Sequence, residues 1–277
     1  RKGMIMKAEK IYLDFNASTP IAPEVAEAMK PFLSQHFGNP SSQHWAGVLA
    51  KEAVEHARQQ VAELLQCSPG EIVFTSGGSE SNNHAIKGVF FALRDKGNHI
   101  ITTQIEHPAV INPCRFLEKL GAEVTYLPVD QYGGVDPQDI RKTITPRTIL
   151  ITVMHANNEV GTIQPIEEIS KIAKERGIVL HTDAAQSVGK IATKVDHLGV
   201  DLLSIAGHKL YAPKGIGALY IRRGTAIEPL IHGAGHESGR RAGTENVLLI
   251  VGLGKACEVA KTYVGDNKMF SMRDRFW

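Results

Sequence analysis

Short apolar runs alternate along the chain with longer segments in which apolar residues recur every three or four positions. The short runs predict buried strands and the longer segments predict amphipathic helices. The expected strands are residues 72–75, 100–103, 124–127, 149–153, 178–181, 202–205 and 217–221. The expected helices are residues 24–33, 46–65, 79–93, 108–120, 165–176 and 247–264. Alternating strands and helices are typical of a mostly parallel sheet with helices on both faces, so the sequence predicts a three-layer α/β/α fold.

The connections predict one large domain with a short segment on each side. Residues 1–20 are expected to form an N-terminal segment, whose part 11–20 is extended and runs into the first helix. Residues 21–260 are expected to form the large domain, because no repeat, low-complexity run or linker interrupts them. Its last strand follows the one before so closely that we expect the two to be antiparallel. Residues 261–277 are expected to begin a small C-terminal domain that is largely missing from the chain.

Composition excludes several classes of protein. The 277 residues are 43% hydrophobic, which is enough for one large domain. The 31 Lys and Arg are scattered and nearly balanced by 29 Asp and Glu, so no nucleic-acid partner is expected. No apolar run is long enough to predict a membrane span, and residues 1–10 lack the apolar core of a secretory signal. Cys67, Cys114 and Cys257 form no disulfide framework or metal spacing, which favours a reducing compartment such as the cytoplasm.

A lysine directly follows the strand predicted at 202–205. The sequence Gly-His-Lys at 207–209 presents His208 and Lys209 from a glycine-containing turn. Desolvation at such a position disfavours the ammonium form, which makes the amine available to attack a carbonyl carbon. We interpret Lys209 as the residue that forms a Schiff base with pyridoxal 5'-phosphate (PLP). The alternative is a surface lysine in a glycine-rich turn.

The strand predicted at 72–75 leads into a turn suited to a phosphate. In the sequence Thr-Ser-Gly-Gly-Ser-Glu-Ser at 75–81, Gly78 lets the main chain approach a ligand and Ser79 begins a helix. Main-chain N–H groups at a helix start bind phosphate, helped by the helix dipole. The turn lacks the lysine of a nucleoside-triphosphate loop and the spacing of a dinucleotide-binding loop. The alternative is an ordinary strand-to-helix turn with Ser79 as N-cap.

Asp183 follows the strand predicted at 178–181, with Thr182 and Gln186 nearby. In open α/β sheets ligands bind at this edge, and a carboxylate there can keep a pyridine nitrogen protonated. The alternative is that Asp183 only caps the next segment. Because all three side chains are polar and lie in one short loop, we favour the ligand-binding interpretation.

Two further strand ends carry candidate ligand-binding side chains. His107, next to Glu106, could stack on a flat ring and move protons, although any one of 12 histidines is more often structural. Asn158, with Asn157 and Glu159, could donate a hydrogen bond to a ring oxygen or stabilise the turn. The histidines do not follow the His-Glu-x-x-His pattern, so no metal site is expected.

The glycine-rich loop at 233–246 contains Arg240, Arg241 and Thr244. Either arginine could pair with a phosphate or carboxylate group. The alternative is a solvated basic turn.

Taken in order, five motifs resemble the cysteine desulfurase family of PLP enzymes, which have the aminotransferase-like fold type I. The motifs are Thr-Ser-Gly-Gly-Ser-Glu-Ser, Glu-His-Pro-Ala-Val, Ala-Asn-Asn-Glu-Val-Gly, His-Thr-Asp-Ala-Ala-Gln-Ser and Gly-His-Lys-x-Tyr. The resemblance implies that Lys209 binds the cofactor covalently, Asp183 pairs with the pyridinium nitrogen, and His107 stacks on the ring and moves protons. It further implies phosphate contacts from Gly78, Ser79 and His208, contacts to the ring oxygen from Asn158 and Gln186, and a contact from Thr244 to the phosphate of the partner subunit in a homodimer.

The resemblance implies conversion of L-cysteine to L-alanine, with the sulfur passed to an enzyme cysteine as a persulfide. The sulfur would then reach an acceptor or iron–sulfur scaffold protein. The family usually has serine where this chain has Ala206, and losing one hydroxyl contact costs about 1 kcal/mol. No position matches the family's persulfide cysteine or its substrate-binding arginine. A selenocysteine lyase and a desulfurase-inactive, PLP-binding regulatory protein therefore remain as alternatives.

Overall fold

The computed structural model describes residues 10–265 and 268–276. Residues 1–9 of the predicted N-terminal segment, and residues 266, 267 and 277 of the predicted C-terminal segment, lie outside the described residues. One seven-stranded sheet organises the described chain, in the order β1-β7-β6-β5-β4-β2-β3. Its strands are β1 (Ile72–Thr75), β2 (His99–Thr103), β3 (Glu123–Leu127), β4 (Thr148–Thr152), β5 (Val179–Asp183), β6 (Leu202–Ala206) and β7 (Gly217–Ile221).

The sheet is parallel except at β7. Strand β7 runs antiparallel to both of its neighbours, β1 and β6, as the short connection from β6 predicts. Strands β1 and β6 therefore point the same way, and the other strands pair in parallel. The carboxyl ends of six strands consequently meet at one edge of the sheet, where β7 begins.

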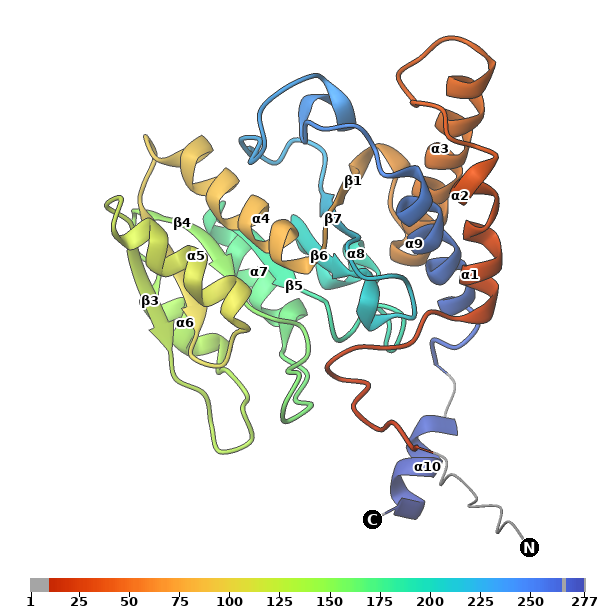
Figure 1. The fold of residues 1–277 in the computed structure, drawn as a ribbon. Coiled ribbons are helices and arrows are strands. Elements are labelled where there is room, and N and C mark those ends of the chain that lie inside the picture. The colour runs from red at the N-terminus through yellow and green to blue at the C-terminus, as the bar shows by residue number, and fades with distance from the viewer. Residues whose placement is uncertain (1–9, 266–267, 277) are drawn as a thin grey trace, which may run out of the picture.

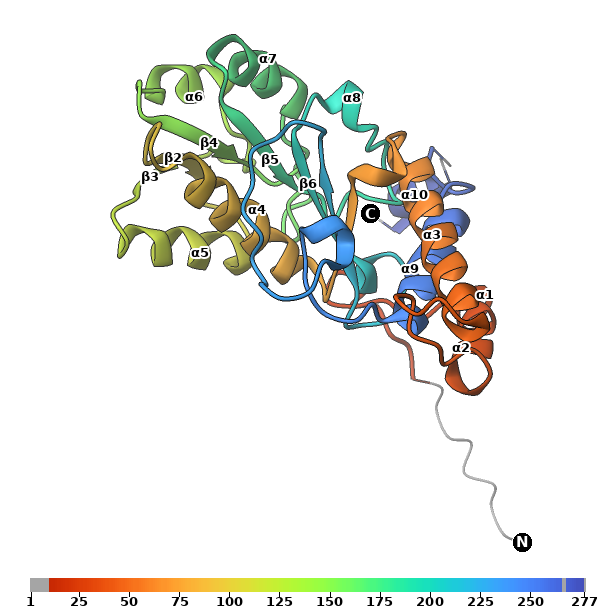
Figure 2. The ribbon, with the colours of Figure 1, turned by 90° about the horizontal axis from the view of Figure 1, so that it is seen from above.

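Helices cover both faces of the sheet, which confirms the predicted three-layer fold (Figures 1 and 2). Helices α4 (Gly78–Leu93) and α5 (Pro108–Glu118) pack on one face around a core that includes Ile86 and Leu150. The larger core, on the other face, lies under helices α3 (Trp45–Leu65), α6 (Pro137–Thr143), α7 (Ile166–Arg176), α8 (Val195–Leu198) and α9 (Val247–Ala260). Helix α1 (Pro23–Met29) packs beside α9, and the remaining helices are α2 (Pro31–Ser34) and α10 (Lys268–Phe276).

Some predicted elements differ from the structure. The helix expected at 24–33 is divided into α1 and α2, because Pro31 has no N–H to donate within a continuous helix. Residues 11–20 form irregular chain with one turn rather than an extended piece. Helix α6 was not predicted, although Asp136 caps it by accepting a hydrogen bond of 2.8 Å from the main-chain nitrogen of Gln138. The helix expected at 247–264 ends earlier, at Ala260.

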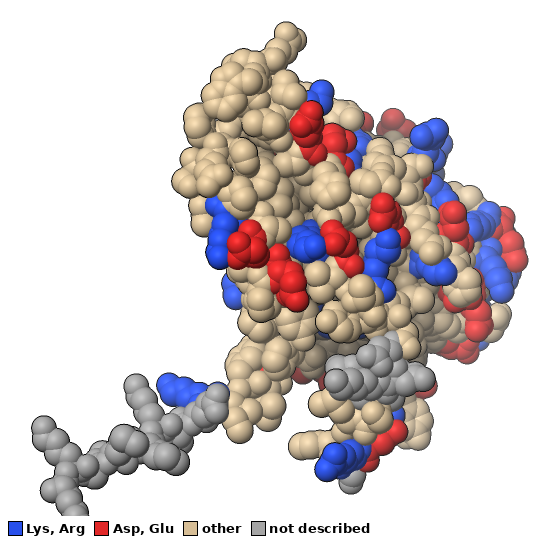
Figure 3. All heavy atoms as spheres, turned by 90° about the vertical axis from the view of Figure 1, so that its right-hand side faces the viewer, with Lys and Arg blue, Asp and Glu red and all other residues tan. Residues whose placement is uncertain are grey.

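Charges of both signs are intermixed on the face shown in Figure 3. Two ion pairs involve α9 and the residue after its C-terminal end: Lys255 with Glu258 at 2.7 Å, and Lys261 with Glu63 of α3 at 2.8 Å. Among the described residues, no helix combines the length and apolar character needed to cross a bilayer.

Candidate active site

A cavity of about 870 Å³ opens at the edge where the parallel strands end. Eight of the nine predicted site residues line it: Gly78, Ser79, His107, Asn158, Asp183, Gln186, His208 and Lys209. Thr244, the ninth, is exposed on the loop between β7 and α9 and does not line this cavity. The structure therefore brings together side chains that the sequence places at the ends of five different strands.

The turn after β1 presents the start of α4 to the cavity. The helix begins at Gly78, one residue earlier than predicted, and Gly77 rather than Ser79 is its N-cap. Gly77 has a φ of 147°, which residues with a side chain rarely adopt. The first N–H groups of a helix have no acceptor within it, so those of Gly78 and Ser79 are available to an anion in the cavity. A Cβ added to Gly78 would lie 3.0 Å from the Cβ of Ala206, so this turn lies tightly against the end of β6.

Lys209 reaches the cavity from a short 3₁₀ turn, Gly207–Lys209, directly after β6. Its Nζ donates hydrogen bonds to the main-chain oxygens of Asn16 and of Ala17, the latter at 3.1 Å. Within the described residues it forms no ion pair. Burial lowers the pKa of Lys209, and the charges of Asp183 and other carboxylates only partly oppose this shift. The amine is therefore easier to deprotonate than an ordinary lysine, as the sequence predicts.

Asp183 ends β5 and is 5% exposed. One carboxylate oxygen accepts from the main-chain nitrogen of Ala185 at 3.0 Å, and the other accepts from Nδ2 of Asn82 at 2.7 Å. Burial raises the pKa of Asp183, although these two hydrogen bonds oppose the shift. A buried carboxylate that lines a cavity is stabilised by a ligand that brings a proton or a positive charge.

The hydroxyl of Thr182, which the sequence placed with Asp183 as a candidate ligand group, is buried and donates to the main-chain oxygen of Val153 at 2.8 Å. It does not reach the cavity, so that interpretation was wrong. Asn82 was missed by the sequence analysis. The sequence signal for Asn82 is a polar residue on the face of α4 that otherwise carries Ala85 and Ile86. Its buried Oδ1 has no hydrogen-bond partner among the described residues.

His107 is the N-cap of α5, and its Nδ1 accepts a hydrogen bond of 3.0 Å from the nitrogen of Ala109. The neutral ring therefore carries its proton on Nε2. Glu106, beside it, is buried behind the cavity, where it accepts from Oγ1 of Thr103 at 2.8 Å and from the nitrogen of Met154 at 2.9 Å. Burial raises the pKa of Glu106 to about 8. Through these hydrogen bonds Glu106 links two segments, the turn that carries His107 and the residues that follow β4.

The N-terminal segment closes one side of the cavity, which the sequence analysis also missed. Asp14, Asn16, Ala17 and Ser18 line the cavity. Gln186 donates from Nε2 to the oxygen of Asn16 at 3.1 Å. Three further contacts join this segment to the site: Asn16 Nδ2 to the oxygen of Asn158 at 3.1 Å, His208 Nδ1 to Ser18 Oγ at 3.4 Å, and Thr19 nitrogen to the oxygen of His208 at 2.9 Å. Nδ2 of Asn158 itself donates to Glu159 at 2.6 Å.

The arginines of the 233–246 loop contact groups of the protein itself, and the carboxylate that Arg241 pairs with is that of Glu80. Arg241 pairs with Glu80 through Nε at 2.8 Å and Nη2 at 3.2 Å. Arg240 donates from Nε to the main-chain oxygen of Glu237 at 3.2 Å.

The cysteines are poor nucleophiles. Cys114 and Cys257 are buried and Cys67 is half-buried, and burial raises the pKa of each thiol to about 12. Each is almost entirely in the thiol form at neutral pH, whereas the thiolate is the reactive form.

Residues 11–270 match the sequence model of the aminotransferase class-V family. The chain belongs to this family. Among curated relatives, it is 62% identical over 255 residues to cysteine desulfurase IscS of Dictyoglomus turgidum, covering 92% of this chain and 64% of the relative. It is 54% identical over 267 residues to cysteine desulfurase IscS of Methanosarcina thermophila, covering 96% of this chain and 66% of the relative. These relatives confirm the resemblance to cysteine desulfurases, and the chain spans slightly less than two thirds of their length.

Among solved structures, the class-V chain is similar to SspA in complex with cysteine, with a TM-score of 0.88 and 50% sequence identity. The match covers 90% of this chain and 72% of SspA. The fold of the sheet and its helices is therefore that of a cysteine-binding relative.

Proposed function

We propose that this chain is the PLP-binding part of a cysteine desulfurase, which converts L-cysteine to L-alanine. The sulfur passes to an enzyme cysteine as a persulfide, for iron–sulfur cluster or thio-cofactor assembly. One observation carries the proposal: Lys209, Asp183 and the free N–H groups at the start of α4 all face one cavity. The names of the curated relatives and the cysteine complex of SspA support the reaction and its substrate.

The residues around the cavity fit PLP group by group. Gly78, Ser79 and His208 would hold the phosphate, and Asp183 would hold the ring nitrogen. Lys209 would hold the aldehyde carbon, because its amine has a lowered pKa and, among the residues that the structure describes, no ion pair that would fix it as ammonium. When bound, PLP supplies an electron-withdrawing ring that stabilises negative charge at the substrate Cα.

The protein's own groups hold and move protons around this centre. Asp183 keeps a proton on the ring nitrogen, because Ala185 and Asn82 fix the orientation of its carboxylate and burial disfavours an uncompensated charge. Lys209 accepts a proton at Nζ when its amine is free. His107 donates or accepts at Nε2, since Nδ1 is occupied by the hydrogen bond from Ala109. In the same proposal Asn158 and Gln186 orient the ring through its oxygen.

The remaining assignments extend the proposal to the assembled protein. We propose a homodimer in which Thr244 contacts the phosphate of the partner's cofactor, and a cytoplasmic location with a sulfur-acceptor or iron–sulfur scaffold protein as partner. Residues 21–260 would form the cofactor-binding domain, and residues 261–277 would begin a second one. We also propose that the persulfide forms on a cysteine other than these three, which the burial and the raised pKa of their thiols support.

Borohydride fixation of PLP tests the assignment of Lys209. The purified protein should form a yellow complex with PLP, and reduction should fix the cofactor to the peptide that contains Lys209. Lys209→Ala should abolish fixation. Lys214→Ala is the matched control, because Lys214 lines the same cavity and should leave fixation unchanged. Fixation that persists in Lys209→Ala would refute the assignment.

Adding L-cysteine to the yellow complex tests the reaction. A spectral change without alanine or sulfide release is expected if the acceptor cysteine lies outside the three in this chain. Release of both products would show that one of these three accepts sulfur, against the expectation from their pKa values. A spectrum that L-cysteine leaves unchanged would contradict the desulfurase proposal, and the same titration with L-selenocysteine measures the selectivity for sulfur over selenium.

A further inference from the structure

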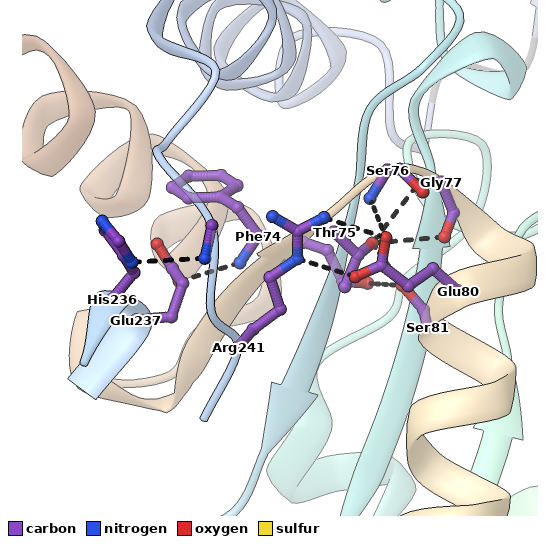
Figure 4. Close-up of polar contacts among 11 residues, drawn as sticks. Phe74, Thr75, Ser76, Gly77, Glu80, Ser81, His236, Glu237 and Arg241 are labelled. Atoms are coloured by element: carbon purple, nitrogen blue, oxygen red, sulfur yellow. Dashed lines mark hydrogen bonds and ion pairs between the residues drawn. The ribbon is translucent and has the colours of Figure 1, made fainter. Parts of the chain in front are cut away.

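The loop between β7 and α9 lies against the turn at the end of β1, where the phosphate site begins (Figure 4). Two of its side chains make the contacts. Glu237 accepts a hydrogen bond of 2.9 Å from the nitrogen of Phe74, and Arg241 pairs with Glu80 of α4. Glu80 in turn accepts from the nitrogen of Ser76 at 2.8 Å. Glu80 lines the cavity, so its pair with Arg241 joins the loop to the phosphate turn.

Glu80 has two opposite effects on an anion at this site. Its carboxylate lies in the first turn of α4, where it orients the Ser76 N–H and so fixes the shape of the turn. The same negative charge repels a phosphate bound to the N–H groups of Gly78 and Ser79. The Glu80 side chain is only 10% exposed, so water screens this repulsion weakly.

Arg241 offsets the charge of Glu80. Its guanidinium, 21% exposed, contacts both carboxylate oxygens, at 2.8 and 3.2 Å. Although burial would raise the pKa of Glu80, the hydrogen bonds from Arg241 and Ser76 lower it overall, so Glu80 is ionised at neutral pH. Figure 4 shows Arg241 pointing at Glu80 from the loop.

We propose that Arg241 is a positioning and charge-compensating residue of the phosphate site, which neutralises Glu80 so that Glu80 can shape the turn without repelling the phosphate. The inference rests on the proposed function, because it assumes that the turn binds the phosphate of PLP. Arg241 acts through Glu80 and does not itself bind the phosphate.

The size of the effect follows from the geometry of a helix. A helix with its side chains is about 10–12 Å across, so a phosphate at its first N–H groups lies within about 10 Å of a side chain in the first turn. An uncompensated unit charge at that separation weakens binding of a singly charged anion on the order of tenfold at an effective dielectric constant of about 20, and more for a dianion.

The experiment compares the dissociation constants of PLP and of pyridoxal, which lacks the phosphate, in four proteins: wild type, Arg241→Met, Glu80→Gln and the double variant. Arg241→Met should weaken PLP binding about tenfold or more and change pyridoxal binding less than about twofold. Glu80→Gln should bind PLP as tightly as wild type or more tightly, because Gln can still accept from Ser76. The double variant should return to within about threefold of wild type, because neither charge remains. Arg240→Met is the matched control, since Arg240 is on the same loop and contacts main-chain oxygens instead of Glu80.

Other outcomes would overturn the inference. If Arg241 bound the phosphate directly, the double variant would bind PLP as weakly as Arg241→Met. If Arg241 only stabilised the loop, PLP and pyridoxal would lose affinity equally, and Glu80→Gln would lose affinity as well. Glu80→Gln decides the question even if Arg241→Met does not fold, because weaker PLP binding in this variant contradicts charge compensation. A wild-type protein that binds neither compound contradicts the proposed function itself, whereas normal PLP binding by Arg241→Met contradicts only the inference.

Discussion

The buried ion pair between Arg58 and Glu237 should contribute strongly to the stability of the fold. Arg58, on α3, donates from Nη1 and Nη2 to the two carboxylate oxygens of Glu237 at 2.7 and 2.8 Å. The two side chains are 9% and 2% exposed. Glu237 also accepts the N–H of Phe74. Glu237 and Ser238 have positive φ values of 49° and 58°, which cost free energy.

Glu237→Ala removes the buried partner of the Arg58 guanidinium, which keeps only the more exposed Glu55, at 3.2 Å, as an ion-pair partner among the described residues, and it removes the acceptor of the Phe74 N–H. An orphaned member of a buried pair costs about 3–5 kcal/mol, and an unsatisfied buried N–H costs about 1–3 kcal/mol. The two costs are not additive for groups in one network, so we expect a loss of about 4 kcal/mol in the free energy of unfolding. In Arg58→Met/Glu237→Gln no buried charge remains and Gln can still accept from Phe74, so the loss should be below about 2 kcal/mol.

Urea unfolding of the three proteins measures these losses, provided that the slopes of the transitions agree. Glu63→Ala is the control, because its pair with Lys261 is exposed and should contribute less than about 1 kcal/mol. The reasoning is refuted if Glu237→Ala loses no more than the control, or if the double variant is as unstable as Glu237→Ala.

Three further measurements test other features of the structure. Gly217→Ala should destabilise the fold strongly, because the added Cβ would lie 2.7 Å from the Cα of Gly77, and a melting temperature unchanged from wild type would contradict this packing. The three cysteines, with pKa values raised to about 12, should react with iodoacetamide at pH 8 only slowly until the protein is unfolded, and fast labelling of the folded protein would show an exposed thiolate. Burial lowers the pKa of His181 to about 3, so the unfolded chain binds a proton near pH 6.5 before the folded one does. The stability that neutral His181 contributes is therefore complete above about pH 6.5 and is lost as the pH falls, at up to about 1.4 kcal/mol per pH unit. The free energy of unfolding of His181→Gln, measured in urea, should depend less on pH than that of the wild type.

Much of this fold and site could be predicted from the sequence because both have local signals. Each buried strand is an apolar run, and the polar residues that follow the runs are forced to one edge by parallel pairing. Lys209, Asp183 and His107 are far apart in the chain, yet the order of strands brings all three to one cavity. The break between α1 and α2 also had a local signal, Pro31. The sequence analysis nevertheless predicted one helix over 24–33, because the apolar residues on both sides of Pro31 keep helical spacing.

The parts that were missed depend on contacts between distant segments. Nothing local indicates that Asn16 would lie beside Gln186, since the two are 170 positions apart. Likewise Arg241 looks like a free anion-binding group until the loop folds over α4 and presents it to Glu80. Such pairings depend on how a loop crosses the sheet, which hydrophobic periodicity does not encode.

The antiparallel strand β7 sets how the two turns of the site meet. Its first residue, Gly217, lies opposite Thr75 of β1 on one side and Ala206 of β6 on the other. Strands β1 and β6 therefore end two strand spacings apart, about 9–10 Å, at the same level of the sheet. The chain that leaves β1 closes this gap across the start of β7, because a Cβ on Gly217 would lie 2.7 Å from the Cα of Gly77 and a Cβ on Gly78 would lie 3.0 Å from that of Ala206. The phosphate turn and the lysine turn thus lie side by side over the first residue of β7, so a one-residue slip of β7 displaces both turns together.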